Sequence, residues 1–82
     1  MTEYVFNIKG VEFVIDDEIK HAIEFFEQGL VYKYAIETLL RAELNRQKIP
    51  EKTGIPVKSL VEQVLEMHRK GEYEVKKNVT GV

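Results

Sequence analysis

The chain has 82 residues, a formal net charge of −2 and no cysteine. This length fits a single domain over residues 1–82, and without cysteine neither a disulfide nor a thiolate metal site can stabilise it. The absence of cysteine favours a reducing compartment, and we expect the cytoplasm. The N-terminus lacks the features of a signal peptide, and no apolar run reaches the roughly 20 residues that span a bilayer, so we expect no membrane contact.

Charge is divided unevenly along the chain. Residues 1–29 carry seven acidic and two basic side chains, whereas residues 30–82 carry seven acidic and ten basic ones. The acidic total disfavours nucleic-acid binding, because phosphate contacts supply most of the non-specific affinity. A local basic patch in the second part of the chain would still provide such contacts.

Two runs rich in β-branched and aromatic residues open the chain, at residues 4–8 and 11–15. Only Lys9 and Gly10 separate them, which predicts a β-hairpin with a two-residue turn. Alternation predicts a core face made of Tyr4, Phe6, Ile8, Val11, Phe13 and Ile15. Val5 and Val14 fall on the other face, which we expect to be partly covered.

Three helices are predicted next. Asp16 or Asp17 is expected to cap a helix from Asp17 to Gln28, in preference to a metal-binding role for the acidic run at residues 16–18. A second helix, from Val31 to Gln47, is expected to be central to the fold. Its apolar stripe contains Tyr32, Ala35, Ile36, Leu39, Leu40 and Leu44, and its solvated side contains Lys33, Glu37 and Arg41.

This second helix is apolar over an unusually wide part of its circumference, because Val31 and Tyr34 extend the stripe. Such a helix packs either inside one chain or across a dimer. We therefore predict a homodimer whose interface includes Val31, Tyr32, Tyr34 and Leu39.

Pro50 ends the second helix and begins a short broken turn, from Ile49 to Gly54. A third helix is predicted from Pro56 to Lys70, followed by a strand from Glu72 to Val75. The expected fold class is α+β, with a hairpin over residues 1–15, a helical part over 16–70, and a strand with a frayed tail over 71–82.

No catalytic motif is visible. The sequence contains no glycine-rich phosphate loop, no His-Glu-x-x-His motif and no nucleophile elbow. The two histidines, His21 and His68, are far apart and have no cysteine to complete a zinc site. We expect no catalytic residue, no cofactor and no bound metal, and we interpret the chain as a protein that is not an enzyme.

The C-terminal half resembles the winged helix-turn-helix family. Residues at the family's usual spacing are Gly54, Leu60, Val64, Met67 and Gly71. The resemblance implies a DNA-binding domain of a transcription regulator. The residues that it assigns to double-stranded DNA are Lys52, Lys58, Gln63, Arg69, Lys70, Lys76 and Lys77. The chain departs from the family at Pro50, and Glu62 and Glu66 would repel phosphates on the recognition face.

Two other interpretations remain open. The strand at residues 11–15 and the two helices that follow resemble a ribbon-helix-helix domain, which dimerises through its strand and reads DNA with it. Alternatively, the chain is a small acidic protein-interaction module, such as an adaptor or inhibitor, that binds no nucleic acid. One continuous basic face would favour DNA, whereas scattered lysines with an exposed apolar patch would favour a protein partner.

Overall fold

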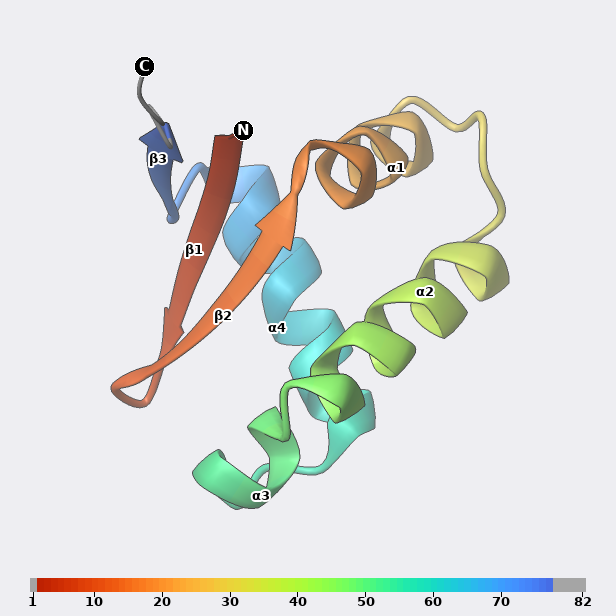
Figure 1. Cartoon of the computed structure of the whole chain (residues 1–82). Helices are drawn as coiled ribbons and strands as arrows, with labels where there is room; N and C mark the ends of the chain where they lie inside the picture. Colours follow the sequence, from red (N-terminus) through yellow and green to blue (C-terminus); the bar gives the residue numbers. More distant parts are fainter. Residues whose placement is uncertain (1, 78–82) are drawn as a thin grey trace.

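A computed structural model describes residues 2–77, so the expected frayed tail at 78–82 lies outside the described residues. Strands β1 (Thr2–Ile8) and β2 (Val11–Asp16) come first, and strand β3 (Glu74–Lys77) comes last. Between them lie helices α1 (Asp17–Glu27), α2 (Lys33–Arg46), α3 (Ile49–Thr53) and α4 (Val57–Lys70) (Figure 1). The predicted α+β class is therefore confirmed.

The N-terminal hairpin forms as predicted. Its two turn residues, Lys9 and Gly10, both have positive φ, at 52° and 80°, which is the geometry that matches the twist of the two strands. The Asn7 side chain supports the turn, since its Oδ1 accepts the Gly10 N–H at 3.0 Å. Register pairs Val5 with Val14 on the face away from the helices, where Val5 is buried and Val14 is half-buried.

Strand β1 lies in the middle of the sheet, in the order β2-β1-β3. Strand β3 runs antiparallel to β1 and pairs Lys77 with Thr2. It begins two residues later than the sequence predicted. The reason is the end of α4, where the Glu72 N–H still donates to the Met67 carbonyl at 2.8 Å, so that Glu72 belongs to the helix cap.

Local sequence explains where the helices begin and end. Asp16 caps α1, because its Oδ1 accepts the Ile19 N–H at 3.0 Å, as predicted. Helix α2 begins at Lys33, since Tyr32 is still extended, with φ −67° and ψ 147°. The expected broken turn forms the five-residue helix α3, in which Pro50 occupies the first turn, where its missing N–H costs nothing.

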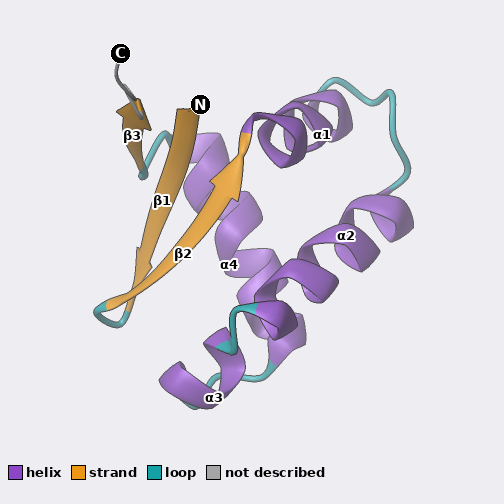
Figure 2. Ribbon diagram, in the orientation of Figure 1, coloured by secondary structure: helices purple, strands orange, loops and turns teal. Residues whose placement is uncertain are grey.

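The helices pack against one face of the sheet, the face that carries Phe6 and Phe13 (Figure 2). The core residues come from every element except β3: Phe6, Ile8, Phe13, Ile15, Ile23, Ile36, Leu40, Leu44, Ile49, Leu60, Val61, Val64 and Leu65. All the predicted inward residues of the hairpin are buried or half-buried. The opposite sheet face carries charged residues, as expected of an antiparallel sheet with one face in water.

The predicted stripe of α2 is divided by the structure. Ile36, Leu40 and Leu44 are fully buried, whereas Tyr32 is 87% exposed and Leu39 is 37% exposed. The part of the stripe that packs inside one chain is therefore Ile36, Leu40 and Leu44. The core of one chain buries only this narrow row of residues, which recur at every fourth position. The rest of the stripe is exposed to solvent.

Candidate interaction surface

Helix α2 exposes a set of uncharged side chains, bordered by the exposed Arg41 and Arg46. The buried row of Ile36, Leu40 and Leu44 marks the side of α2 that faces the core. The opposite side carries six exposed residues that recur three or four positions apart, namely Tyr34, Ala35, Thr38, Leu39, Ala42 and Asn45. None of them is charged. We call this set the α2 outer face.

Two details make the α2 outer face more apolar than its composition suggests. The Thr38 hydroxyl donates to the Tyr34 carbonyl at 2.9 Å, so its hydrogen bond is made within the helix. Tyr34 is 80% exposed, so almost its whole ring is in contact with water. A solvent-facing helix face normally carries charged side chains, and 32% of this chain is charged. The α2 outer face departs from that pattern.

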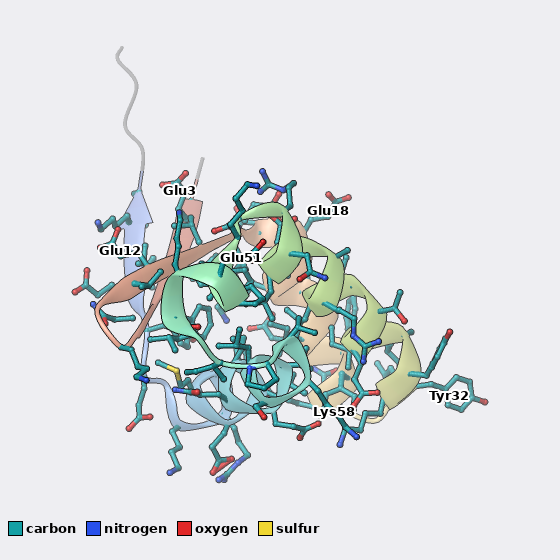
Figure 3. The ribbon with its side chains drawn as sticks, turned by 90° about the horizontal axis from the view of Figure 1, so that it is seen from below. Glu3, Glu12, Glu18, Tyr32, Glu51 and Lys58 are labelled. Atoms are coloured by element: carbon teal, nitrogen blue, oxygen red, sulfur yellow. The ribbon has the colours of Figure 1, made fainter. Side chains whose placement is uncertain are left out.

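Exposed apolar side chains continue beyond the N-terminal end of α2. Leu30 is 69% exposed, and Phe25 of α1 is 48% exposed. The Leu30 N–H donates to the Phe25 carbonyl at 2.9 Å, which holds the connecting loop against the end of α1. Figure 3 shows Tyr32 projecting away from the rest of the molecule at this end. The apolar surface is therefore contributed by α1, the loop and α2.

The residues predicted for a dimer interface lie on this surface or beside it. They are Val31, Tyr32, Tyr34 and Leu39, of which the last three are exposed and Val31 is half-buried. They are accessible to a partner, and the homodimer itself stays a prediction.

The residues predicted to contact DNA are divided among three elements. All seven are exposed: Lys52 on α3, Lys58, Gln63, Arg69 and Lys70 on α4, and Lys76 and Lys77 on β3. Lys76 pairs in register with Glu3, so it lies on the sheet face away from the helices. Its neighbour Lys77 lies on the other face, because side chains alternate along a strand. The two β3 lysines therefore do not act from one face.

Two glutamates lie between the cations on the exposed side of α4. Lys58, Glu62, Glu66 and Arg69 follow one another at spacings of three or four residues. The Arg69 guanidinium donates to both Glu66 carboxylate oxygens, at 2.9 and 2.6 Å, and Lys70 Nζ lies 3.6 Å from the same carboxylate. The hydrogen bond from Arg69 holds the pKa of Glu66 below its usual value. Glu66 thus offsets one of the two positive charges that Arg69 and Lys70 would offer to phosphate.

A cluster of polar side chains lies between α1, α4 and the sheet. Lys20 Nζ lies 2.8 Å from Glu24 Oε2 and 3.3 Å from His68 Nε2, while His68 Nδ1 lies 2.8 Å from Glu27 Oε2. An ammonium can only donate, so His68 accepts at Nε2 and donates from Nδ1 to Glu27. The Tyr73 ring stacks on His68 with centroids 5.4 Å apart. We call these five residues the Lys20 cluster.

The Lys20 cluster keeps a charge inside the fold. Burial lowers the pKa of the Lys20 ammonium, but hydrogen bonds to Glu24 and Tyr73 outweigh burial and leave that pKa raised. The Lys20 hydrogen bond likewise holds the pKa of the Glu24 carboxyl below its usual value. Lys20 Nζ also lies 5.2 Å from the centre of the Tyr73 ring, a distance suited to a cation–π contact. The cluster therefore joins α1 to α4 and to the segment before β3.

A shallow acidic groove of about 710 Å³ lies where β2, the start of α1 and the end of α2 meet. Its charged lining residues are Glu3, Asp16, Asp17, Glu18, Glu43 and Arg46. Asp17 accepts a hydrogen bond from the Tyr4 hydroxyl at 2.8 Å, and Glu43 pairs with Arg46. Within residues 2–77 no group of three or more potential ligands is arranged to hold a metal ion. Asp16, Asp17 and Glu43 thus make local contacts within the fold.

Sequence reasoning singled out only Tyr34 and Leu39 of the α2 outer face, and it did not find the Lys20 cluster. One available signal was the strict four-residue repeat of Ile36, Leu40 and Leu44, which alone fixes the buried side of α2 and leaves Thr38 and Ala42 opposite. Lys20 gave no such signal. A lysine beside apolar helix positions is usually solvated, and the partners that bury it lie more than 40 residues away.

None of the helices within residues 2–77 is long and apolar enough to cross a membrane. No protein-family model matches the chain, and neither a curated protein nor a solved structure matches it.

Proposed function

We propose that this chain is a protein-interaction module that binds its partner through the α2 outer face and the exposed apolar residues beside it. The observation that carries the proposal is the exposed, uncharged side of α2, opposite the row of α2 residues that the core buries. Contiguous apolar surface of this kind is typical of interaction sites. Tyrosine at the centre of such a surface is a frequent energetic anchor, because it offers a large contact area and few rotatable bonds.

The exposed side chains set the size of the expected contribution to the binding free energy. Moving one Leu or Tyr side chain from water to a packed interface contributes roughly 1.5–3 kcal/mol. In the free chain Tyr34 is 80% exposed and Tyr32 is 87% exposed. Both would therefore contribute most of their burial energy to binding, and neither contributes much to folding.

DNA binding is supported less well. The cations assigned by the winged-helix resemblance are separated by two glutamates on α4 and are divided between the two sheet faces on β3. The strand of the ribbon-helix-helix resemblance has β1 along one edge, and Gln47 hydrogen-bonds to Val14 on its other edge. A partner strand would have to displace that contact. The scattered cations and the exposed apolar surface together favour a protein partner.

Site-specific photo-cross-linking tests the proposal. A benzophenone amino acid replaces Tyr34, and a control chain carries it at Glu12, which is exposed on the sheet at a distance from Tyr32 (Figure 3). Both chains are irradiated in extract of the source cells. We expect cross-linked adducts when the benzophenone amino acid replaces Tyr34 and none when it replaces Glu12.

Competition makes the result specific. An excess of the unmodified chain should abolish the Tyr34 adducts. The same excess of an Ala42→Glu variant should not, because it places a charge in the middle of the α2 outer face. A Ser59→Glu variant adds the same charge on exposed α4 and should compete fully. Equal adducts from both positions, or equal competition by both variants, would overturn the proposal.

A further inference from the structure

The sheet has two outer edges, and within residues 2–77 only one of them is closed. The strand order makes β2 and β3 the edge strands. Gln47 covers the edge of β2 by bonding to the backbone of Val14. No described element lies beyond β3 (Figure 1), and all four of its residues are exposed. We infer that β3 is a dimerisation edge, which pairs antiparallel with β3 of a second copy of this chain and joins the two three-stranded sheets into one.

The register shows which backbone groups of β3 are free. The Val14 N–H and C=O point away from β1, because both bond to Gln47. Val5, which pairs with Val14, therefore points its own N–H and C=O toward β3, where it pairs with Glu74. These directions alternate along a strand, so the Val75 N–H and C=O point away from β1 into the open edge. A free donor and acceptor of this kind is a template for an incoming strand.

One register of two antiparallel β3 strands is complementary in both backbone and side chains. A two-fold axis perpendicular to the sheet keeps every side chain on its own face, so residues of the same face pair with each other. With the axis at Val75, the two Val75 residues exchange both of their free backbone hydrogen bonds. Glu74 then lies opposite the second copy's Lys76, and the reverse. This is a non-hydrogen-bonded pair, in which side chains are closest, so two identical ion pairs form.

The neighbours on β1 fit the same register. On the sheet face away from the helices, Lys76 lies beside Glu3, so the second copy's Glu74 would continue a row of alternating charge. Among residues 2–77 neither Glu74 nor Lys76 makes an ion pair. On the helix face, Val75 lies beside Tyr4 and is 52% exposed. The second copy's Val75 would cover this apolar side chain.

The charges of β3 select a second copy over other strands. Lysine on an edge strand normally prevents pairing with foreign chains. In this register the second copy meets Lys76 with Glu74, so the charge that repels other strands favours its own kind. The arrangement is isologous and closed, because both outer edges of the joined sheet are β2 strands covered by Gln47. This edge is separate from the α2 outer face, so the inference does not depend on the proposed function.

Sedimentation equilibrium and amide hydrogen exchange test the inference together. Strands of four residues bury less area than a standard interface, so we expect a transient dimer that forms at high concentration. Raising the concentration should slow exchange of the Val75 amide as the dimer fraction grows. The Glu74 amide points toward β1 at every concentration, so its slow exchange is the internal control for an intact β3. A chain that stays monomeric at millimolar concentration, or a dimer with unchanged Val75 exchange, overturns the inference.

Charge reversal tests the register. Glu74→Lys places lysine opposite lysine in both pairs and should weaken the dimer by roughly tenfold, and Lys76→Glu should weaken it at least as much. A one-to-one mixture of the two variants should recover most of the lost affinity, because every facing pair is again complementary. Glu12→Lys makes the same change on the same sheet face, but on β2, and should leave the dimer intact. Slow exchange of the amide at position 74 confirms that β3 is in place in each variant. Dimers that ignore Glu74→Lys, or that Glu12→Lys weakens equally, overturn the proposed pairing.

Discussion

Lys20 is the buried cation where helix α1 meets α4 and the segment before β3. Replacing it with methionine keeps most of the side-chain volume but removes the donor to His68 Nε2 and to the Glu24 carboxylate. An acceptor left buried without a partner costs about 1–3 kcal/mol, so Lys20→Met should lower the free energy of unfolding by that amount. Urea denaturation measures the change. Lys52→Met on exposed α3 is the control and should change stability by less than about 0.5 kcal/mol. Equal midpoints for the two variants would show that the cluster contributes nothing.

Glu43 makes stability depend on pH on the acid side. Hydrogen bonds from Arg46 and Gln47 hold the pKa of its carboxyl below the usual 4.5 in the folded chain. A lowered folded pKa means that Glu43 contributes stability above pH 4.5, and that this contribution is lost as pH falls through the folded pKa. The Glu43→Gln variant should therefore be less stable at neutral pH and should lose less stability below pH 4.5. Thermal melting against pH measures both effects, and Glu51→Gln is the exposed control. If Glu43→Gln lost as much stability below pH 4.5 as the unaltered chain does, the role given to Glu43 would be wrong.

At the scale of elements, the outer edge of strand β2 is closed by the side chain of Gln47, the residue that follows the end of α2. Gln47 accepts the Val14 N–H at 3.1 Å and donates to the Val14 carbonyl at 2.7 Å, so its amide imitates a neighbouring strand. Gln47→Ala should cost about 1–3 kcal/mol, since two hydrogen bonds are lost. It should also speed hydrogen exchange at the Val14 amide and promote association through the open edge. Exposed Gln63→Ala is the control. Unaltered exchange at Val14 would contradict this role.

The secondary-structure elements could be predicted from the sequence more reliably than the contacts between them. The hairpin was predictable because Lys9-Gly10 is a local turn signal, and the start of α1 was predictable because an aspartate cap is also local. Strand β3 was misplaced by two residues, because its start depends on how α4 ends. The burial of Lys20 depends on contacts between distant segments, and a periodic pattern alone contains no information about those. The buried side of α2 was marked by the four-residue repeat of Ile36, Leu40 and Leu44, but the wider apolar stripe around it obscured that signal.

At the scale of the whole molecule, the scattered cations predict weak interaction with DNA. We expect no binding of random duplex DNA at tens of micromolar protein in low salt, measured by fluorescence anisotropy. Binding by a basic face would instead weaken with salt, with a log–log slope of roughly −0.9 per phosphate contacted. Replacing Lys76 and Lys77 with glutamine would then flatten that slope by up to about two units. Such a result would restore the DNA-binding interpretation at the expense of the protein-interaction module.

The pairing of Thr2 with Lys77 makes the domain almost circular. Because these two residues are neighbours across the sheet, a short linker could join them without disturbing any element. New ends could then be opened at the exposed Lys9-Gly10 turn, which would convert the hairpin into two separate strands and place β3 and β1 in one continuous hairpin. The order in which the chain is synthesised would change, while the contacts outside the opened turn stayed the same. Comparing how the two chains fold would show what depends on the contacts and what depends on the order of synthesis. In the natural order, β1 can pair with β3 only after β3 has been synthesised.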